Sequence, residues 1–325
     1  MAERGQCADA RQGAAGWRDA GRSEGMTIGY VGLGSMGGAL ARRLQLSHPL
    51  RVYDVHPEAI ASVVEEGATG CRSLRELADQ CDVILLCLPT SEHVRSALFG
   101  ADGLAAGLRP GTVVIDQTSG DPIVTRAIGA ELEQRGVALV DAPVSGGRQG
   151  AEAGTIAIMV GAAPEHFARI EPVLRAISAN VFHAGGLGAG QVIKLSNNLM
   201  SAAQRLLTFE AVALAVKNGI EPATACEILL AGGGRNVFLE KFMAPHVIEG
   251  RLSSGFTLGL MHKDVRLACQ LGSDSGVPMF FGGVTREFYQ LCINAMGRDA
   301  QVHTAALVVD GMAGTHVVPA GTRPE

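Results

Sequence analysis

Hydrophobic and polar positions follow two different rhythms along the chain, and the change between them lies near residue 187. In the first part, short apolar and β-branched runs alternate with segments in which apolar residues recur at helical spacing. The runs predict strands over 27–32, 50–54, 82–89, 112–116, 136–143 and 154–162. The spacing between them predicts helices over 36–47, 57–66, 73–79, 91–98, 122–135 and 163–178. This alternation is typical of an α/β fold with a doubly wound parallel sheet.

The second part shows helical spacing throughout and no convincing strand. It predicts helices over 190–218, 222–231, 236–248, 259–274 and 279–296. The first of these ends before Asn218-Gly219 and is about 40 Å long at 1.5 Å per residue, which suits a helix that joins two domains. The pattern divides the chain into a flexible N-terminal extension (1–25), an α/β domain (26–187), an all-helical domain (188–313) and a flexible tail (314–325).

The amino-acid composition and net charge indicate which kind of molecule the protein binds. The 325 residues are 47% hydrophobic and 18% charged, as in a globular protein, and the net charge of −5 argues against nucleic acid or a membrane surface as the main partner. The apolar run 83–89 is shorter than the roughly 18 residues of a membrane-spanning helix. Seven scattered cysteines without a Cys-x-x-Cys pair indicate reduced thiols and a cytoplasmic protein. We therefore expect a small-molecule partner.

Three glycines between the first strand and the first helix predict a dinucleotide site. In Gly32-x-Gly34-x-x-Gly37, the first glycine permits the tight turn, the second lets a pyrophosphate approach the backbone, and the third lets helix and strand pack closely. Asp54 ends the next strand about 20 residues later, where a carboxylate accepts a hydrogen bond from a ribose hydroxyl. The predicted cofactor-binding residues here are Gly32, Leu33, Gly34, Ser35, Met36, Gly37 and Asp54. A purely structural turn is the alternative.

The residues after Asp54 favour NAD over NADP. Val55 and His56 stand where an arginine usually binds the 2′-phosphate, and the Asp54 carboxylate would repel that phosphate. Arg51 and His56 are nearby cations that leave NADP open.

Four separated motifs carry a family resemblance. They are "GYVGLGSMG" at the cofactor, "DAPVSGG" at 141–147, "GAGQVIKLSNN" at 188–198 and "GFTLGLMHKD" at 255–264. With these motifs in this order over about residues 26–312, the chain resembles the β-hydroxyacid dehydrogenases, which include 3-hydroxyisobutyrate dehydrogenase and tartronate semialdehyde reductase. The resemblance implies a Rossmann-type domain, a helical C-terminal domain and a homodimer or homotetramer.

Lys194 and Asn198 are the candidate chemical centre. They are four residues apart and so share one face of the long helix. Burial and a neighbouring cation can lower the pKa of an ammonium until it exchanges protons with an alcohol at the working pH. The resemblance implies that Lys194 is the catalytic acid/base and that Asn198 holds the same substrate oxygen. A solvated surface lysine is the alternative.

The resemblance also implies the remaining site residues. Ser145, Gly146 and Gly147 would hold the substrate carboxylate, with glycines that let backbone donors converge on an anion. Phe256 and Asp264 would form the pocket wall, although a surface charge is an alternative for Asp264. The implied cofactor contacts are Leu88, Pro89, His93, Ser119 and Lys263. Thr118-Ser119 inverts the usual family order, which leaves that contact open, and His93 has no partner at metal-ligand spacing, so no metal is expected.

The functional expectation is an NAD(P)-dependent oxidoreductase (EC 1.1.1 type) that transfers a hydride between the cofactor and a small 3-hydroxy acid, giving its semialdehyde or keto acid. An imine reductase is one alternative, but the lysine at 194 argues against it. A non-catalytic dinucleotide-binding regulatory protein is another, and Lys194, Asn198 and Ser145 argue against that. In 231–242, three glycines precede Arg235 and Asn236, which could contact the substrate or could be solvated residues at a helix start.

Overall fold

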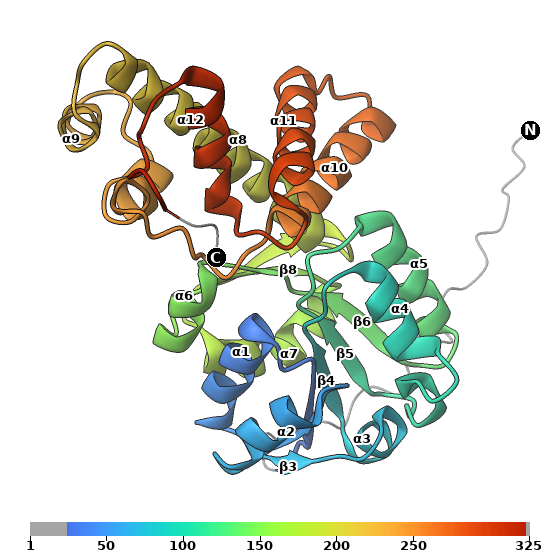
Figure 1. Cartoon of the computed structure of the whole chain (residues 1–325). Coiled ribbons are helices and arrows are strands. Elements are labelled where there is room, and N and C mark those ends of the chain that lie inside the picture. Colours follow the sequence, from blue (N-terminus) through green and yellow to red (C-terminus); the bar gives the residue numbers. More distant parts are fainter. Residues whose placement is uncertain (1–24, 323–325) are drawn as a thin grey trace, which may run out of the picture.

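The computed structural model describes residues 25–322, so nearly all of the extension expected over 1–25 lies outside the described residues. The first part of the chain forms one nine-stranded sheet with strand order β3-β2-β1-β4-β5-β6-β8-β7, and β9 pairs with β8 (Figure 1). The strands are β1 (Ile28–Val31), β2 (Leu50–Tyr53), β3 (Thr69–Gly70), β4 (Val83–Leu86), β5 (Val113–Asp116), β6 (Ala138–Asp141), β7 (Val144–Ser145), β8 (Ala157–Gly161) and β9 (Val181–Gly185).

The parallel, doubly wound arrangement predicted from the sequence is confirmed for β1 to β6. Within this group every pair of adjacent strands is parallel, and the order reverses direction between β1 and β4 as in a Rossmann-type sheet. The edge beyond β6 differs, because β8 runs antiparallel to both β6 and β7, while β9 runs parallel to β8. The short strands β3 and β7, and also β9, were not predicted. The sheet is therefore mixed.

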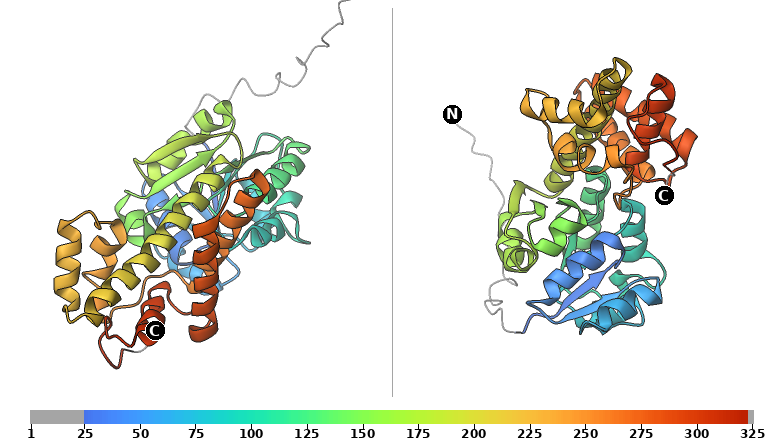
Figure 2. Two further views of the ribbon diagram at one scale, coloured as in Figure 1. Left: turned by 90° about the horizontal axis from the view of Figure 1, so that it is seen from above. Right: turned by 60° about the vertical axis from the view of Figure 1, so that its left-hand side comes forward.

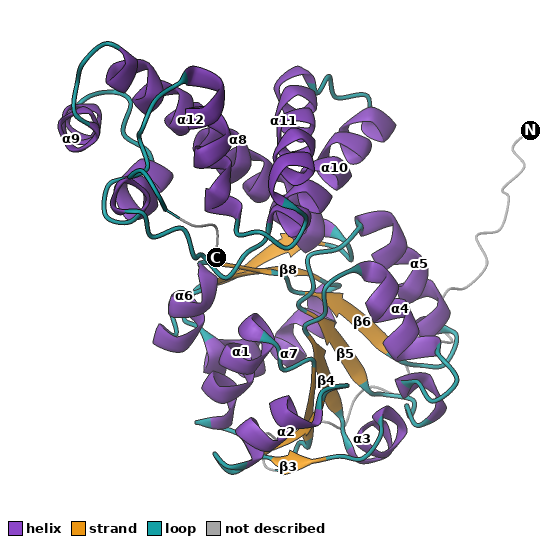
Figure 3. Ribbon diagram, in the orientation of Figure 1, coloured by secondary structure: helices purple, strands orange, loops and turns teal. Residues whose placement is uncertain are grey.

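Helices cover both faces of the sheet (Figure 3). Leu40 and Leu174 belong to an apolar core on one face, whereas Leu77, Leu98 and Leu132 belong to a separate core on the other. The helices of this domain are α1 (Ser35–Gln45), α2 (Pro57–Val64), α3 (Leu74–Gln80), α4 (Ser91–Phe99), η1 (Leu104–Ala106), α5 (Pro122–Glu133), α6 (Gly147–Ala153) and α7 (Pro164–Ile177).

The second part of the chain is helical, as predicted, and stands on one end of the sheet domain (Figure 2). It has its own apolar core, which includes Phe209, Tyr289 and Met243. Its elements are α8 (Ala189–Lys217), α9 (Pro222–Ala231), η2 (Leu239–Met243), η3 (Val247–Glu249), α10 (Leu258–Ser275), α11 (Phe280–Met296), η4 (Val302–Thr304) and α12 (Ala305–Ala313).

Two expectations in this domain need correction. The helix expected over 236–248 is a short π-helix, η2, followed by a 3-10 turn, η3, because Pro245 lies between them and lacks the N–H that a continuous helix would use. The tail expected to be flexible from residue 314 is packed over Thr315–Val318. Asp310 accepts hydrogen bonds from the Thr315 hydroxyl and from the N–H groups of Val317 and Val318, and both valines are buried. The helix α12 was not predicted.

Among the described residues, α8 is the one helix long and apolar enough to cross a membrane by length and composition. Core helices meet the same criterion. Lys194, Asn198 and Arg205 are polar residues of α8 that are buried in the folded protein. We therefore interpret α8 as the core helix that carries the site described below.

Candidate active site

The glycine-rich turn between β1 and α1 has the geometry of a phosphate-binding loop. Gly32 has φ +90°, and a Cβ there would collide with the carbonyl oxygen of Cys87. A Cβ on Gly37 would collide with the carbonyl oxygen of Gly32, so both positions require glycine. Gly34 is exposed and a Cβ there would meet no atom within 4 Å, which leaves the backbone open to a ligand. Ser35 and Met36 then begin α1, where free N–H groups favour an anion.

Asp54 lies against this turn. Its Oδ2 accepts a hydrogen bond from the Leu33 N–H at 2.6 Å, and its Oδ1 accepts one from the His56 N–H at 2.9 Å. A carboxylate has further acceptor sites, so Asp54 can still accept the hydroxyls of a ribose. Val55 is exposed beside it, whereas Arg51 lies near the thiols of Cys71 and Cys81. These residues fit a dinucleotide cofactor.

Asp141, at the end of β6, anchors the start of α8. Its two carboxylate oxygens accept hydrogen bonds from the N–H of Gly188 at 2.6 Å and from the N–H of Gln191 at 2.8 Å. The Gln191 side chain then accepts from the Gly120 N–H and donates to the Thr118 carbonyl. Burial raises the pKa of Asp141 to about 6, and the two helix N–H groups oppose that rise. The sheet domain thus sets the position of α8.

Lys194 and Asn198 form a buried polar chain with α10. The Lys194 ammonium donates to Asn198 Oδ1 at 3.1 Å, and Asn198 Nδ2 donates to Asp264 Oδ2 at 2.5 Å. The other oxygen of Asp264 lies 3.2 Å from the Lys263 ammonium. Burial lowers the pKa of Lys194, with a smaller contribution in the same direction from Lys263, whereas Asp264 opposes the change. A lysine in these surroundings can gain and lose a proton closer to neutral pH.

Ser145, in the sheet domain, is connected to the same hydrogen-bonded group of residues. Asn197 Nδ2 donates to the Ser145 hydroxyl at 3.1 Å and also to Asn198 Oδ1 at 3.1 Å. Because the hydroxyl oxygen accepts this bond, its own proton remains available for a carboxylate. Gly146 and Gly147 follow with φ +139° and +70°, backbone conformations that favour glycine, and both are exposed. Ser145 is therefore connected to Lys194 through Asn197 and Asn198, and Gly146 and Gly147 follow it directly in the sequence.

Lys263 links the two domains. Its ammonium donates to the carbonyl oxygens of Pro89, at 3.1 Å, and Ser119. Leu88, which precedes Pro89, donates its N–H to Thr118 Oγ1 at 3.0 Å, and its side chain lies against Gly32. The predicted residues at the ends of β4 and β5 therefore meet Lys263 near the glycine-rich turn.

Two predicted residues form no hydrogen bond with Lys194, Asn198 or Asp264. His93 is exposed on α4 and its Nδ1 lies 2.7 Å from the Thr90 hydroxyl, which caps that helix. Phe256 packs against the core of the helical domain, and its carbonyl accepts from the Val302 N–H. Among residues 25–322 there is no group of three His, Cys, Asp or Glu that could hold a metal ion.

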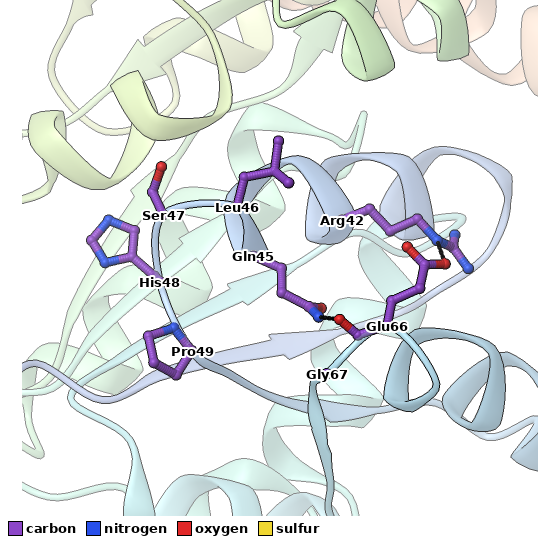
Figure 4. A pocket seen from close by; sticks show the side chains of 8 residues that line it. All are labelled: Arg42, Gln45, Leu46, Ser47, His48, Pro49, Glu66 and Gly67. Carbon is purple, nitrogen blue, oxygen red and sulfur yellow. Dashed lines mark hydrogen bonds and ion pairs between the residues drawn. The ribbon is translucent and has the colours of Figure 1, made fainter.

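Two open depressions are lined by residues of α1 and neighbouring segments, and Lys194 is not among their lining residues. One, of about 540 Å³, borders the glycine-rich turn at Gly34 and Ser35 and reaches Arg148. The other, of about 460 Å³, lies at the far end of α1, where Arg42 pairs with Glu66 (Figure 4). The second contains none of the predicted site residues.

Sequence reasoning missed Asn197, Gln191 and Asp141 as members of the site. All three lie inside motifs already singled out, "DAPVSGG" and "GAGQVIKLSNN", so their positions carried a signal. Their contacts join residues 47 to 73 positions apart, which helical spacing does not reveal.

Comparisons with known proteins agree with this geometry. Residues 27–186 match the model of the NAD binding domain of 6-phosphogluconate dehydrogenase, and residues 188–309 match a model described as NAD-binding of NADP-dependent 3-hydroxyisobutyrate dehydrogenase. The chain belongs to the 3-hydroxyisobutyrate dehydrogenase family of β-hydroxyacid dehydrogenases. It is accordingly an NAD(P)-dependent enzyme of the 3-hydroxyacid dehydrogenase family, as the sequence predicted.

Three relatives illustrate the similarity. The NAD-dependent L-serine dehydrogenase of Pseudomonas aeruginosa is 38% identical over 82% of this chain and 92% of its own length. The 2-(hydroxymethyl)glutarate dehydrogenase of Eubacterium barkeri is 36% identical over 81% of this chain and 88% of its own length. The structure of Mycobacterium tuberculosis 3-hydroxyisobutyrate dehydrogenase with L-serine has 31% identity and a TM-score of 0.77, and covers 87% of this chain and 99% of that one.

Proposed function

We propose that this chain is an NAD-preferring dehydrogenase that interconverts a small 3-hydroxy acid and its semialdehyde or keto acid, with Lys194 as the general acid/base. The observation that supports this most is the buried Lys194, whose pKa is lowered by burial and which bonds to Asn198 at the boundary between the domains. The nicotinamide, when bound, supplies the hydride acceptor or donor.

In this proposal each residue of the site has a distinct role in proton transfer, substrate binding or cofactor binding. Lys194 takes the hydroxyl proton of the substrate during oxidation and returns it during reduction. Asn198 holds the same oxygen and keeps the ammonium in place, while Asp264 orients the Asn198 amide. Ser145, Gly146 and Gly147 bind the substrate carboxylate. Lys263, Leu88, Pro89 and Ser119 border the nicotinamide end of the cofactor, and His93 is a more distant cofactor contact.

The cofactor preference rests on Asp54. Its carboxylate faces the glycine-rich turn, and the exposed Val55 offers no cation to a 2′-phosphate. We therefore propose NAD as the preferred cofactor.

The substrate class follows from the relatives' names, which include 3-hydroxyisobutyrate, L-serine and 2-(hydroxymethyl)glutarate. A panel of these three acids, assayed by nicotinamide absorbance with NAD and with NADP, tests the proposal. Oxidation of at least one of them with a KM in the millimolar range or below supports it. Absence of turnover on all three with both cofactors contradicts it.

The alternatives are less well supported. An imine reductase or a non-catalytic regulatory protein would give no reason for a buried lysine with a lowered pKa beside Asn198. The cytoplasmic location remains a prediction from the cysteine pattern.

We also propose that the chain is a homo-oligomer built on α8. Four apolar side chains recur along it at seven-residue intervals and are 48% to 67% exposed, namely Ile193, Met200, Leu207 and Leu214. Seven-residue spacing is the repeat of a helix–helix seam, and a second copy of α8 is a matching partner for it.

A further inference from the structure

Arg205 is a buried cation without an anionic partner. It lies on α8 with 6% of its surface exposed, and its Nε and Nη1 atoms have no hydrogen-bond partner. No Asp or Glu in the described part of the chain forms an ion pair with it. The two buried carboxylates described in the helical domain are used elsewhere, since Asp264 bonds to Asn198 and Asp310 accepts three bonds from the C-terminal segment. A buried charge left in this state is costly for folding.

His303 beside it has a second unpartnered polar atom. The ring is 1% exposed, and its Nδ1 has no hydrogen-bond partner. Burial, with smaller contributions from Arg205 and His246, lowers the pKa of His303 to about 3, so the ring is neutral at physiological pH. A neutral imidazole can donate one hydrogen bond to a carboxylate. The two side chains therefore offer an anion a guanidinium and an imidazole N–H.

Arg205 lies on the same face of α8 as Lys194 and Asn198. The separations of eleven and seven residues correspond to almost whole numbers of helical turns. Helical side chains point back toward the N-terminus, so the guanidinium lies over the preceding turn. The contacts of Tyr289 agree with this placement of the guanidinium near Ala202. Tyr289 is close to Arg205, and its hydroxyl donates to the Ala202 carbonyl at 3.4 Å. Ala202 is one turn, about 6 Å, from Asn198.

Aromatic rings cover this pair. The Phe238 ring lies over the guanidinium at 4.8 Å, and the rings of Phe238 and Phe242 lie 5.5 Å and 5.4 Å from His303. Phe238 is carried by a segment that follows three exposed glycines, residues 232–234, and precedes the π-helix η2. Glycines lower the cost of moving such a segment, and π-helical turns are frequent at functional sites.

We propose that Arg205 and His303 bind a second acidic group of the substrate, so that this enzyme prefers hydroxy acids with a carboxylate at each end. The inference rests on the proposed function. The first carboxylate lies at Ser145–Gly147 and the reacting oxygen at Lys194 and Asn198. The distal carboxylate then reaches one helical turn further along α8, past the small side chain of Ala202, when Phe238 moves aside.

The test compares diacids with monoacids in the intact protein. We expect wild-type kcat/KM for 2-(hydroxymethyl)glutarate to exceed that for 3-hydroxyisobutyrate and L-serine at least tenfold. Arg205→Gln should lose about ten- to hundredfold in kcat/KM for the diacid, mainly through KM, because a hydrogen bond to a charged group is lost. Its kcat/KM for the monoacids should stay within about threefold. Equal losses on both classes, or a wild-type preference for the monoacids, would overturn the inference.

A binding measurement separates this inference from the proposed function. Calorimetry with NAD present compares glutarate with butyrate on wild type, Arg205→Gln, Arg205→Lys and the control Arg286→Gln, whose arginine already pairs with Glu287. Tighter wild-type binding of glutarate, weakened in Arg205→Gln but kept in Arg286→Gln and partly restored in Arg205→Lys, supports the site even if no hydroxy acid is turned over. Equal binding of glutarate and butyrate to wild type overturns it even if Arg205→Gln does not fold.

Discussion

The Lys194 ammonium donates a hydrogen bond to the Asn198 side-chain oxygen at 3.1 Å, within one turn of the same helix. The hydrogen-bond partner of the lysine is therefore a neutral amide, and the Asp264 carboxylate bonds to that amide rather than to the ammonium. Asp264 is paired instead with Lys263. Burial can therefore lower the pKa of Lys194 without a salt bridge that would hold the proton in place.

Replacement of Lys194 tests its role in proton transfer. General acid–base catalysis contributes about 10²- to 10⁴-fold, so Lys194→Ala and Lys194→Arg should each lose at least 100-fold in kcat, because arginine holds its proton too firmly to act as a base. NAD affinity, measured by fluorescence titration, should remain near wild type. Recovery of most activity in Lys194→Arg would instead indicate that only the positive charge is needed. Wild-type kcat in Lys194→Ala would contradict the mechanism.

The lowered pKa of Lys194 predicts the pH dependence of oxidation. Oxidation requires the neutral amine as proton acceptor, so kcat should rise with pH and level off. Because burial lowers the pKa of the lysine, the midpoint should lie below 10.5, the ordinary value for lysine. The reverse reaction requires the ammonium, and its kcat should fall over the same range. Initial rates in both directions between pH 6 and 10.5 measure this, and a pH-independent kcat for oxidation would argue against Lys194 as the base.

Ser145 and Asn197 provide a paired test of the carboxylate loop. Ser145→Ala removes a hydrogen bond to a charged group, so kcat/KM should fall about 10- to 150-fold with little change in NAD affinity. Asn197→Ala frees the Ser145 hydroxyl from its partner and should give a smaller loss, mainly in KM. Steady-state kinetics and NAD titration measure both. Impaired NAD binding with normal substrate kinetics in Ser145→Ala would assign this residue to the cofactor.

The fold was predictable where hydrophobic periodicity is strong. The strands β1, β2, β4, β5 and β6 and the helix α8 were predicted from apolar runs and spacing. The helix α6 was not predicted because glycines interrupt its sequence. The strands β3 and β7 have two residues each, too few to show a periodic pattern. In the site, the spacing of Lys194 and Asn198 was visible. Their connection to Asp264, 66 residues later in the chain, depends on how α8 packs against α10.

The residues at the end of β2 predict the cofactor preference. If Asp54 accepts the ribose hydroxyls, wild type should have a higher kcat/KM with NAD than with NADP. Asp54→Ser combined with Val55→Arg should shift the preference toward NADP, since a repulsive carboxylate is replaced and a cation is added at an exposed position. Val55→Arg alone is the control for the added charge. A tenfold preference of wild type for NADP would contradict this interpretation of Asp54.

The exposed apolar stripe on α8, formed by Ile193, Met200, Leu207 and Leu214, predicts an oligomer. Like charges introduced into the stripe should dissociate it, and opposite charges should restore it. In an antiparallel pair of α8 helices centred near residues 203 and 204, Met200 faces Leu207 of the other copy and Ile193 faces Leu214, and burial of each such side chain is worth about 1.5–3 kcal/mol. The double variant Met200→Glu, Leu207→Glu should therefore shift the protein toward monomers in analytical ultracentrifugation. Met200→Glu with Leu207→Lys places opposite charges against each other and should recover much of the association. Leu46→Glu, at an exposed position on the sheet domain, is the control. If the protein is monomeric before any substitution, or if all three variants associate equally, the stripe is not the interface.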